Sequence, residues 1–154
     1  MALAGLLQQD AILPGLKVNS KKQLLLELSA RAAKITGISE REIFDVILQR
    51  ERLGSTGVGN GIAIPHGKLT GLPAIVGVFA RLESPIDFEA LDDQPVDLVF
   101  LLLAPEGAGA DHLKALSRIA RLLRDPDVVA RLRAIDSASA IYAFLSDERS
   151  SNAA

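Results

Sequence analysis

The stretch V-D-L-V-F-L-L-L-A at residues 96–104 decides the fold class. Its apolar character is almost continuous, which is typical of a strand covered on both faces. A second run of this kind, A-I-V-G-V-F-A-R-L, occupies residues 74–82. The segment between them, residues 83–95, contains two prolines and several acids and predicts a loop with a short excursion. The two runs therefore predict the centre of a β-sheet with further layers on both sides.

Helix signals precede these strands. Ser20-x-x-Gln23 and Ser39-x-x-Glu42 are capping boxes, in which two side chains satisfy backbone donors at the start of a helix. Apolar residues follow each box at helical spacing. Gly37 predicts the end of the first helix, and Leu53-Gly54 predicts the end of the second. Two consecutive helices are therefore expected before the strands.

Three more helix starts follow the strands. Asp111 is expected to cap the first helix, Asp125-Pro126 fits the cap and first turn of the second, and Ser137 begins the third. This order predicts an α/β protein, a three-layer α/β/α arrangement with a small mixed β-sheet flanked by helices. The sheet is expected to be mixed because the glycine-rich segment at residues 54–67 is too short for a helical crossover.

The composition excludes several classes of protein. The chain has 154 residues, so we expect residues 1–147 to form a single domain and residues 148–154 a disordered tail. A net charge of −2 gives no basic field for nucleic acid or an anionic membrane, and no apolar run is long enough to cross a bilayer. The absence of cysteine excludes disulfides and thiol catalysis. We expect a cytoplasmic protein that binds no nucleic acid and does not insert into a membrane.

The glycines between residues 54 and 67 do not form a nucleotide-binding motif. A phosphate-binding P-loop would need glycine in place of Ile62 and serine or threonine in place of Leu69. The dinucleotide fingerprint fails as well, because Ile62 stands where its third glycine should be. The two histidines, His66 and His112, have no recognised metal-ligand spacing. The sequence therefore predicts neither a cofactor nor a metal.

One of the two histidines, His66, lies in a tightly specified stretch of backbone. Pro65 before it has a fixed φ and no backbone donor, and Gly67 after it lets the chain turn with no side chain beside the ring. In an extended chain, Lys68 would place its ammonium on the same face as the imidazole. Taken alone, such a histidine can simply end a strand and bond to its own turn. A neutral imidazole beside a cation also suits a nucleophile that accepts a phosphoryl group.

Residues 50–68, R-E-R-L-G-S-T-G-V-G-N-G-I-A-I-P-H-G-K, resemble a known active-site signature. The signature is that of type-2 IIA domains of the bacterial phosphoenolpyruvate:sugar phosphotransferase system, the fructose/mannitol IIA family. The likeness continues through residues 85–88, 94–98 and 111–113, so it covers nearly the whole chain. Within the family, the chain is most similar to the nitrogen-related branch.

The resemblance implies roles for individual residues. His66 corresponds to the phosphorylated histidine, with Nε2 as the expected nucleophile, Arg50 to the active-site arginine, and His112 to the second histidine. Without the resemblance, Arg50 and His112 would be interpreted as ordinary helix residues. The residues expected to contact the phosphoryl group or a partner are Lys68, Ser55, Thr56, Gly59 and Gly61. For Gly59 and Gly61, the absence of a side chain would leave room for the backbone of another molecule.

The function implied by the resemblance is that of a phosphocarrier. The expected donor is a histidine-phosphorylated carrier protein, HPr-like or NPr-like, and the expected output is regulation of target proteins according to phosphorylation state. One alternative is a sugar-specific IIA component that passes phosphoryl to a IIB component in fructose or mannitol uptake. Another is a binding module in which His66 is never phosphorylated. The chain is expected to be a monomer or a weak dimer.

Overall fold

The computed structural model describes residues 5–147, and the expected tail at residues 148–154 lies outside this range. The elements before the glycine-rich segment are η2 (Gln9–Ala11), β1 (Ile12–Leu16), α1 (Lys21–Thr36) and α2 (Glu40–Arg52). The strands that follow are β2 (Gly57–Gly59), β3 (Ile62–Ala63), β4 (His66–Leu69), β5 (Val76–Ile86) and β6 (Val96–Pro105). Three helices complete the described chain, α3 (Ala110–Leu122), α4 (Pro126–Ala134) and α5 (Ala138–Ser146).

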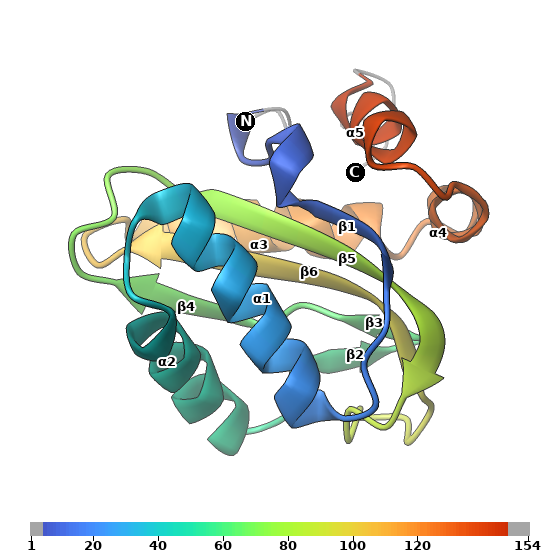
Figure 1. The fold of residues 1–154 in the computed structure, drawn as a ribbon, viewed down its shortest axis with the longest axis horizontal. Helices are drawn as coiled ribbons and strands as arrows, with labels where there is room; N and C mark the ends of the chain where they lie inside the picture. Colours follow the sequence, from blue (N-terminus) through green and yellow to red (C-terminus); the bar gives the residue numbers. More distant parts are fainter. Residues whose placement is uncertain (1–4, 148–154) are drawn as a thin grey trace.

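The strands form one mixed sheet of six strands in the described range, which confirms the predicted fold class. Its main path runs β1-β5-β6-β3-β2. Strand β4 lies off this path and also pairs with β6, further along β6 than β3 does. β1–β5, β3–β6 and β4–β6 are parallel pairs, whereas β5–β6 and β2–β3 are antiparallel. Figure 1 shows α1 and α2 crossing one face of the sheet and α3 lying on the other. The three layers are therefore helix, sheet and helix.

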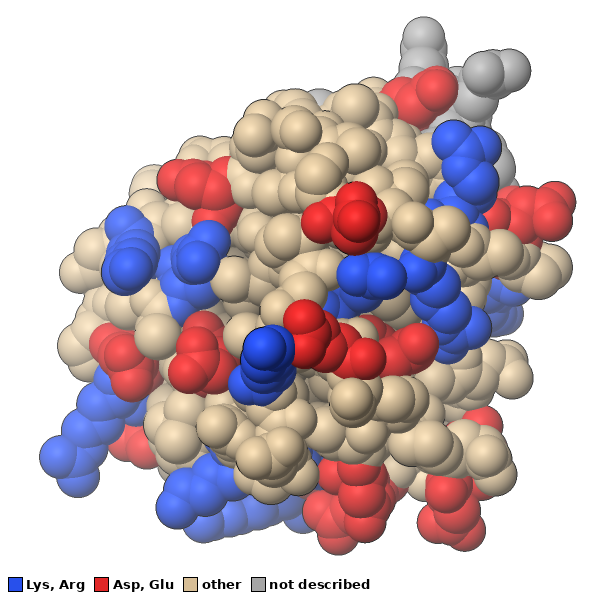
Figure 2. Space-filling view, turned by 45° about the vertical axis from the view of Figure 1, so that its right-hand side comes forward, with Lys and Arg blue, Asp and Glu red and all other residues tan. Residues whose placement is uncertain are grey.

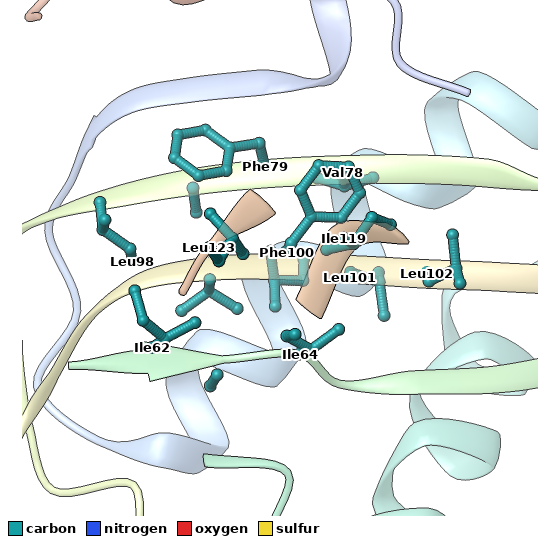
Figure 3. Close-up of a cluster of buried hydrophobic side chains, with 14 of the residues drawn as sticks. Ile62, Ile64, Val78, Phe79, Leu98, Phe100, Leu101, Leu102, Ile119 and Leu123 are labelled. Atoms are coloured by element: carbon teal, nitrogen blue, oxygen red, sulfur yellow. The ribbon is translucent and has the colours of Figure 1, made fainter. Parts of the chain in front are cut away.

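The central strand β6 is buried on both faces, as its apolar sequence predicts. Every side chain from residue 98 to residue 104 is fully buried. Phe100 pairs across the antiparallel ladder with Phe79 of β5, and their ring centroids are 6.2 Å apart. Figure 3 shows these rings with Ile62 and Ile64 from the glycine-rich segment and Ile119 from α3. The core thus joins the segment before His66 to the centre of the sheet.

The predicted helix starts are confirmed except for one. The Ser20 and Ser39 hydroxyls accept hydrogen bonds from the backbone N–H groups of Gln23 and Glu42, which is the serine half of each capping box. The Gln23 side chain accepts from the backbone N–H of Asn19 and not from that of Ser20. Asp111 was predicted to cap α3, but it does not. The cap residue is Gly109, whose φ of 54° a residue with a side chain would adopt only under strain, and Asp111 lies inside the first turn.

Two strand predictions are also corrected. β1 was not predicted, because Pro14 and Gly15 within it interrupt any strand pattern. It is tolerated as an edge strand, where a missing backbone donor costs little. The predicted strand at residues 74–82 instead spans Val76–Ile86, so part of the expected loop belongs to the sheet. The register shifts between Arg81 and Ile86, and residues 83–85 of the strand are exposed, so the apolar run ends before the strand does.

Gly67 has a different role from the turn that was expected. It lies inside β4 and has no positive φ. A Cβ atom at this position would lie only 2.5 Å from Cγ1 of Val46 in α2. The missing side chain therefore lets α2 pack directly on β4, and this packing brings the last turn of the helix beside His66.

Substituting Gly67→Ala should destabilise the protein by about 1–3 kcal/mol, because the stiff, β-branched Val46 cannot move aside without a shift of α2. Urea unfolding of the single variant, of Val46→Ala and of the double variant measures the coupling. The double variant should lose less free energy of unfolding than the sum of the single losses. Strict additivity would show that the Val46 contact does not determine how α2 packs.

Candidate functional site

The predicted histidines and basic residues meet in one surface pocket of about 440 Å³. The last turn of α2 contributes Arg50, β4 contributes His66 and Lys68, and the first turn of α3 contributes His112. The remaining lining residues are Val46, Gln49, Leu53 and Gly67. Residues as far apart in the sequence as Val46 and His112 are thus brought together by the packing of α2 and α3 around β4.

The backbone selects one tautomer of His66. Its Nδ1 atom lies 2.9 Å from the carbonyl oxygen of Ile64. A carbonyl oxygen can only accept a hydrogen bond, so Nδ1 must carry the proton and Nε2 must carry a lone pair. Because Pro65 between them has a fixed φ, the ring is held against the carbonyl of the same short segment. His66 therefore presents Nε2 as a nucleophilic nitrogen.

Arg50 points directly at this nitrogen. Its Nε–H group donates to His66 Nε2 at 3.2 Å, and its Nη1 group donates to the carbonyl of Gly54 at 2.9 Å. The second bond fixes the guanidinium at the end of α2. A planar guanidinium in this position can exchange its bond to the imidazole for bonds to the oxygens of an anion bound there.

His112 lies against His66 from the other side of the pocket. The two ring centroids are 5.7 Å apart and the ring planes are tilted by 51°. His112 is 6 % exposed, and its Nδ1 atom has no hydrogen-bond partner among the described residues. It is the third residue of α3, where the backbone N–H groups of a helix favour an anion. The position of His112 in the first turn of α3 suits the binding of a negatively charged group.

The surroundings keep both imidazoles neutral. Burial lowers the pKa of His66 from its ordinary value of 6.5, and the positive charge of Arg50 lowers it further, whereas the bond to Ile64 raises it. Burial also lowers the pKa of His112, with smaller contributions from His66 and Lys68. Only the unprotonated form of His66 has a free lone pair on Nε2. The lowered pKa therefore favours the reactive form near neutral pH.

Ser55, Thr56, Gly59 and Gly61 do not line this pocket. The Ser55 hydroxyl donates to the carbonyl of Phe88, and Thr56 binds the carboxylate of Glu51. Beside Gly59 and Gly61, side chains of this chain occupy the space in which the backbone of another molecule was expected. Asp92 lies beside Gly59, whereas Arg133 and Asp97 lie beside Gly61. Gly59 and Gly61 have positive φ values of 106° and 81° and belong to the tight β2–β3 turn.

The sequence interpretation gave no role to Glu51, the residue that holds this glycine-rich segment in place. Its side chain is almost fully buried and accepts the backbone N–H of Thr56 at 3.1 Å. Lys21, thirty positions earlier in the chain, lies 2.9 Å from the same carboxylate. A signal for Glu51 was present in the sequence, since an acidic residue at the end of a helix opposes the helix dipole and calls for an explanation.

The chain matches the family model described as phosphoenolpyruvate-dependent sugar phosphotransferase system, EIIA 2, over residues 5–148. It belongs to this family. A nitrogen regulatory protein from Bradyrhizobium diazoefficiens is 66 % identical over 145 residues, which cover 94 % of this chain and 95 % of that protein. The described fold resembles the crystal structure of nitrogen regulatory protein IIA-Ntr from Neisseria meningitidis, with a TM-score of 0.88, 36 % identity and coverage of 93 % and 98 % of the two chains.

Family membership confirms the resemblance to the nitrogen-related branch and gives the protein a phosphocarrier role in the phosphotransferase system. The Escherichia coli mannitol IIA structure shares the fold with a TM-score of 0.75, at 22 % identity and with coverage of 90 % and 97 % of the two chains.

Figure 2 shows acidic and basic side chains interspersed on one face of the molecule. Within residues 5–147, no helix is both long enough and apolar enough to cross a membrane.

In an NMR titration, His66 should titrate below 6.5, and Arg50→Gln should raise its pKa because a nearby positive charge is removed. Arg52→Gln, on the same helix but outside the pocket, is the matched control and should leave the titration unchanged. The unfolded imidazoles accept protons more readily than the folded ones. The two histidines therefore reduce the free energy of unfolding as pH falls through 6.5 toward their lower folded pKa values. A His66 pKa above 6.5 would contradict this account of the site.

Proposed function

We propose that the protein accepts a phosphoryl group from a histidine-phosphorylated carrier protein onto Nε2 of His66, and that it regulates partner proteins according to its phosphorylation state. The observation that carries the first part is the bond between His66 Nδ1 and the Ile64 carbonyl, which leaves Nε2 free of a proton. A donor of this kind, HPr-like or NPr-like, implies that the protein acts in the cytoplasm.

The transfer itself needs no proton to leave the acceptor nitrogen. A bond forms between Nε2 of His66 and phosphorus, while the bond between phosphorus and the donor imidazole breaks and the donor nitrogen keeps the electron pair. Nδ1 of His66 retains its proton, and the Ile64 carbonyl stabilises the positive charge that the ring acquires. The catalytic contribution of the protein is therefore to position the ring and to balance charge.

Three groups are placed to balance the charge of the phosphoryl oxygens. Arg50 gives up its bond to Nε2 and turns its fork toward the oxygens. Lys68 adds a second positive charge from the same strand as His66. His112 can donate from a neutral ring in the first turn of α3, where the helix N-terminus accommodates negative charge.

The regulatory part of the proposal is supported by the comparisons. The 66 % identical relative carries the name nitrogen regulatory protein, whereas the mannitol IIA is only 22 % identical. The alternative is a sugar-specific component that passes the phosphoryl group to a IIB component. This alternative is favoured by the description of the family as belonging to a sugar phosphotransferase system. Acceptance of phosphoryl by a IIB component separates the two functions.

The acceptor is tested by incubating the protein with the general phosphotransferase enzyme, carrier protein and phosphoenolpyruvate. Intact mass should show one added phosphoryl group that is stable in alkali and labile in acid, and His66→Ala should show none. Arg50→Ala should slow transfer about ten- to a hundredfold, which corresponds to the loss of a charged hydrogen bond of about 1.5–3 kcal/mol. Arg52→Ala serves as the charge-matched control. Normal phosphorylation of His66→Ala would refute the assignment.

The regulatory output is tested by quantitative pull-down with unphosphorylated protein, phosphorylated protein and His66→Ala. A phosphoryl group adds about −1.5 to −2 charges beside Leu53, which lines the pocket and is 84 % exposed. A partner that covers this apolar side chain should be released on phosphorylation, and a partner with basic groups should be gained. Equal capture by all forms, together with ready transfer to a sugar-specific IIB component, would support the transport function instead.

A further inference from the structure

A buried polar cluster of Lys21, Glu51 and Thr56 lies outside the His66 pocket. The Glu51 side chain is 3 % exposed and the Lys21 side chain 17 %, and the two charged groups are 2.9 Å apart. The carboxylate of Glu51 accepts both the backbone N–H and the hydroxyl of Thr56. The Lys21 ammonium also lies over the ring of Phe88, 4.5 Å from its centroid. Figure 1 shows the start of α1 and the end of α2 at the lower edge of the view, where Lys21 and Glu51 are in contact.

The stability of the helices gives no reason for this pair. Lys21 is the first residue of α1, where the helix dipole disfavours a positive charge, and Glu51 lies in the last turn of α2, where the dipole disfavours a negative one. Burial adds a desolvation cost that the attraction between two such charges often fails to recover. The cluster therefore does not act by stabilising the ends of α1 and α2.

The cluster holds the backbone that fixes both nitrogens of His66. The carbonyl of Thr56 accepts the backbone N–H of Ile64 at 3.0 Å, and the carbonyl of Ile64 accepts the Nδ1–H of His66 at 2.9 Å. On the other side, Gly54, two residues before Thr56, accepts the Arg50 guanidinium that donates to Nε2. The segment at residues 54–56 thus supports the partner of each ring nitrogen, and Glu51 anchors this segment.

We propose that Glu51 is a positioning residue for phosphoryl acceptance, which with Lys21 and Thr56 sets the tautomer and orientation of His66 through the backbone of Thr56 and Ile64. The role rests on the proposed function of His66. Glu51 does not line the pocket. Its charge raises the pKa of His66, but it holds the orientation and tautomer of the ring through other residues. Loss of its charge leaves Lys21 without its closest counterion and frees the segment at residues 54–56 to shift.

The direct test is Glu51→Gln, which keeps the size of the side chain and removes its charge. Nitrogen-15 NMR of the unphosphorylated protein should show His66 almost entirely as the Nδ1–H tautomer in the wild type and as a mixture of tautomers in the variant. In the phosphorylation assay, kcat should fall on the order of ten- to a hundredfold, with little change in the KM for the carrier protein. Glu83→Gln is the matched control, because its ion pair with Lys17 is exposed and spans 3.9 Å.

A second pair of variants keeps the proposal testable if Glu51→Gln fails to fold. Thr56→Val removes only the hydroxyl that binds Glu51 and should also mix the tautomers, whereas Thr56→Ser retains the hydroxyl and should preserve the wild-type tautomer. Unchanged imidazole shifts in folded Glu51→Gln or in Thr56→Val would overturn the proposal. The NMR result needs no phosphorylation. Failure of the proposed function, seen as a wild-type protein that accepts no phosphoryl, is therefore distinguishable from failure of this proposal.

Discussion

The hydrogen bond from His66 Nδ1 to the carbonyl of Ile64 is the constraint on which the rest of the site depends. It spans only two residues, yet it decides which nitrogen carries the proton and therefore which nitrogen can attack phosphorus. Arg50 can point at Nε2 only because this nitrogen is a hydrogen-bond acceptor. The neutral state of the ring, favoured by burial and by the arginine charge, keeps the same nitrogen reactive. Orientation, tautomer and charge state thus follow from one local backbone geometry.

The fold supplies the parts that this geometry requires. The buried strand β6 pairs with both β3 and β4, so the segment that carries Ile64 and His66 is fixed to the centre of the sheet. The missing side chain of Gly67 lets α2 approach β4 and places Arg50 within hydrogen-bonding distance of the ring. On the other side, α3 begins soon after β6 ends, which places His112 beside His66 of β4. The sheet and the two helices packed around β4 therefore position the side chains of the site.

Local sequence patterns predicted the features that depend on local physics. The apolar run at residues 96–104 identified the central strand, and the serine caps of α1 and α2 lie where the capping boxes placed them. The resemblance then assigned Arg50, His66, Lys68 and His112, which the fold brings into one pocket. Features set by tertiary contacts could not be predicted in this way. Strand β1 was not predicted because Pro14 and Gly15 interrupt its pattern. Gly67 was predicted to form a turn, whereas it allows close contact with Val46. The partner of Glu51, Lys21, lies thirty residues away in the sequence. Ser55 and Thr56, adjacent to the signature glycines, serve the backbone and not the pocket.

The central claim is that the backbone makes Nε2 of His66 the acceptor of the phosphoryl group. The most direct measurement is nitrogen-15 and phosphorus-31 NMR of the phosphorylated protein labelled at its histidines, in which the chemical shifts and coupling of the ring nitrogens identify the phosphorylated atom. We expect phosphorus bound to Nε2 of His66, with a proton retained on Nδ1 and bonded to the Ile64 carbonyl. Phosphorus on Nδ1 of His66, or on His112, would contradict the account.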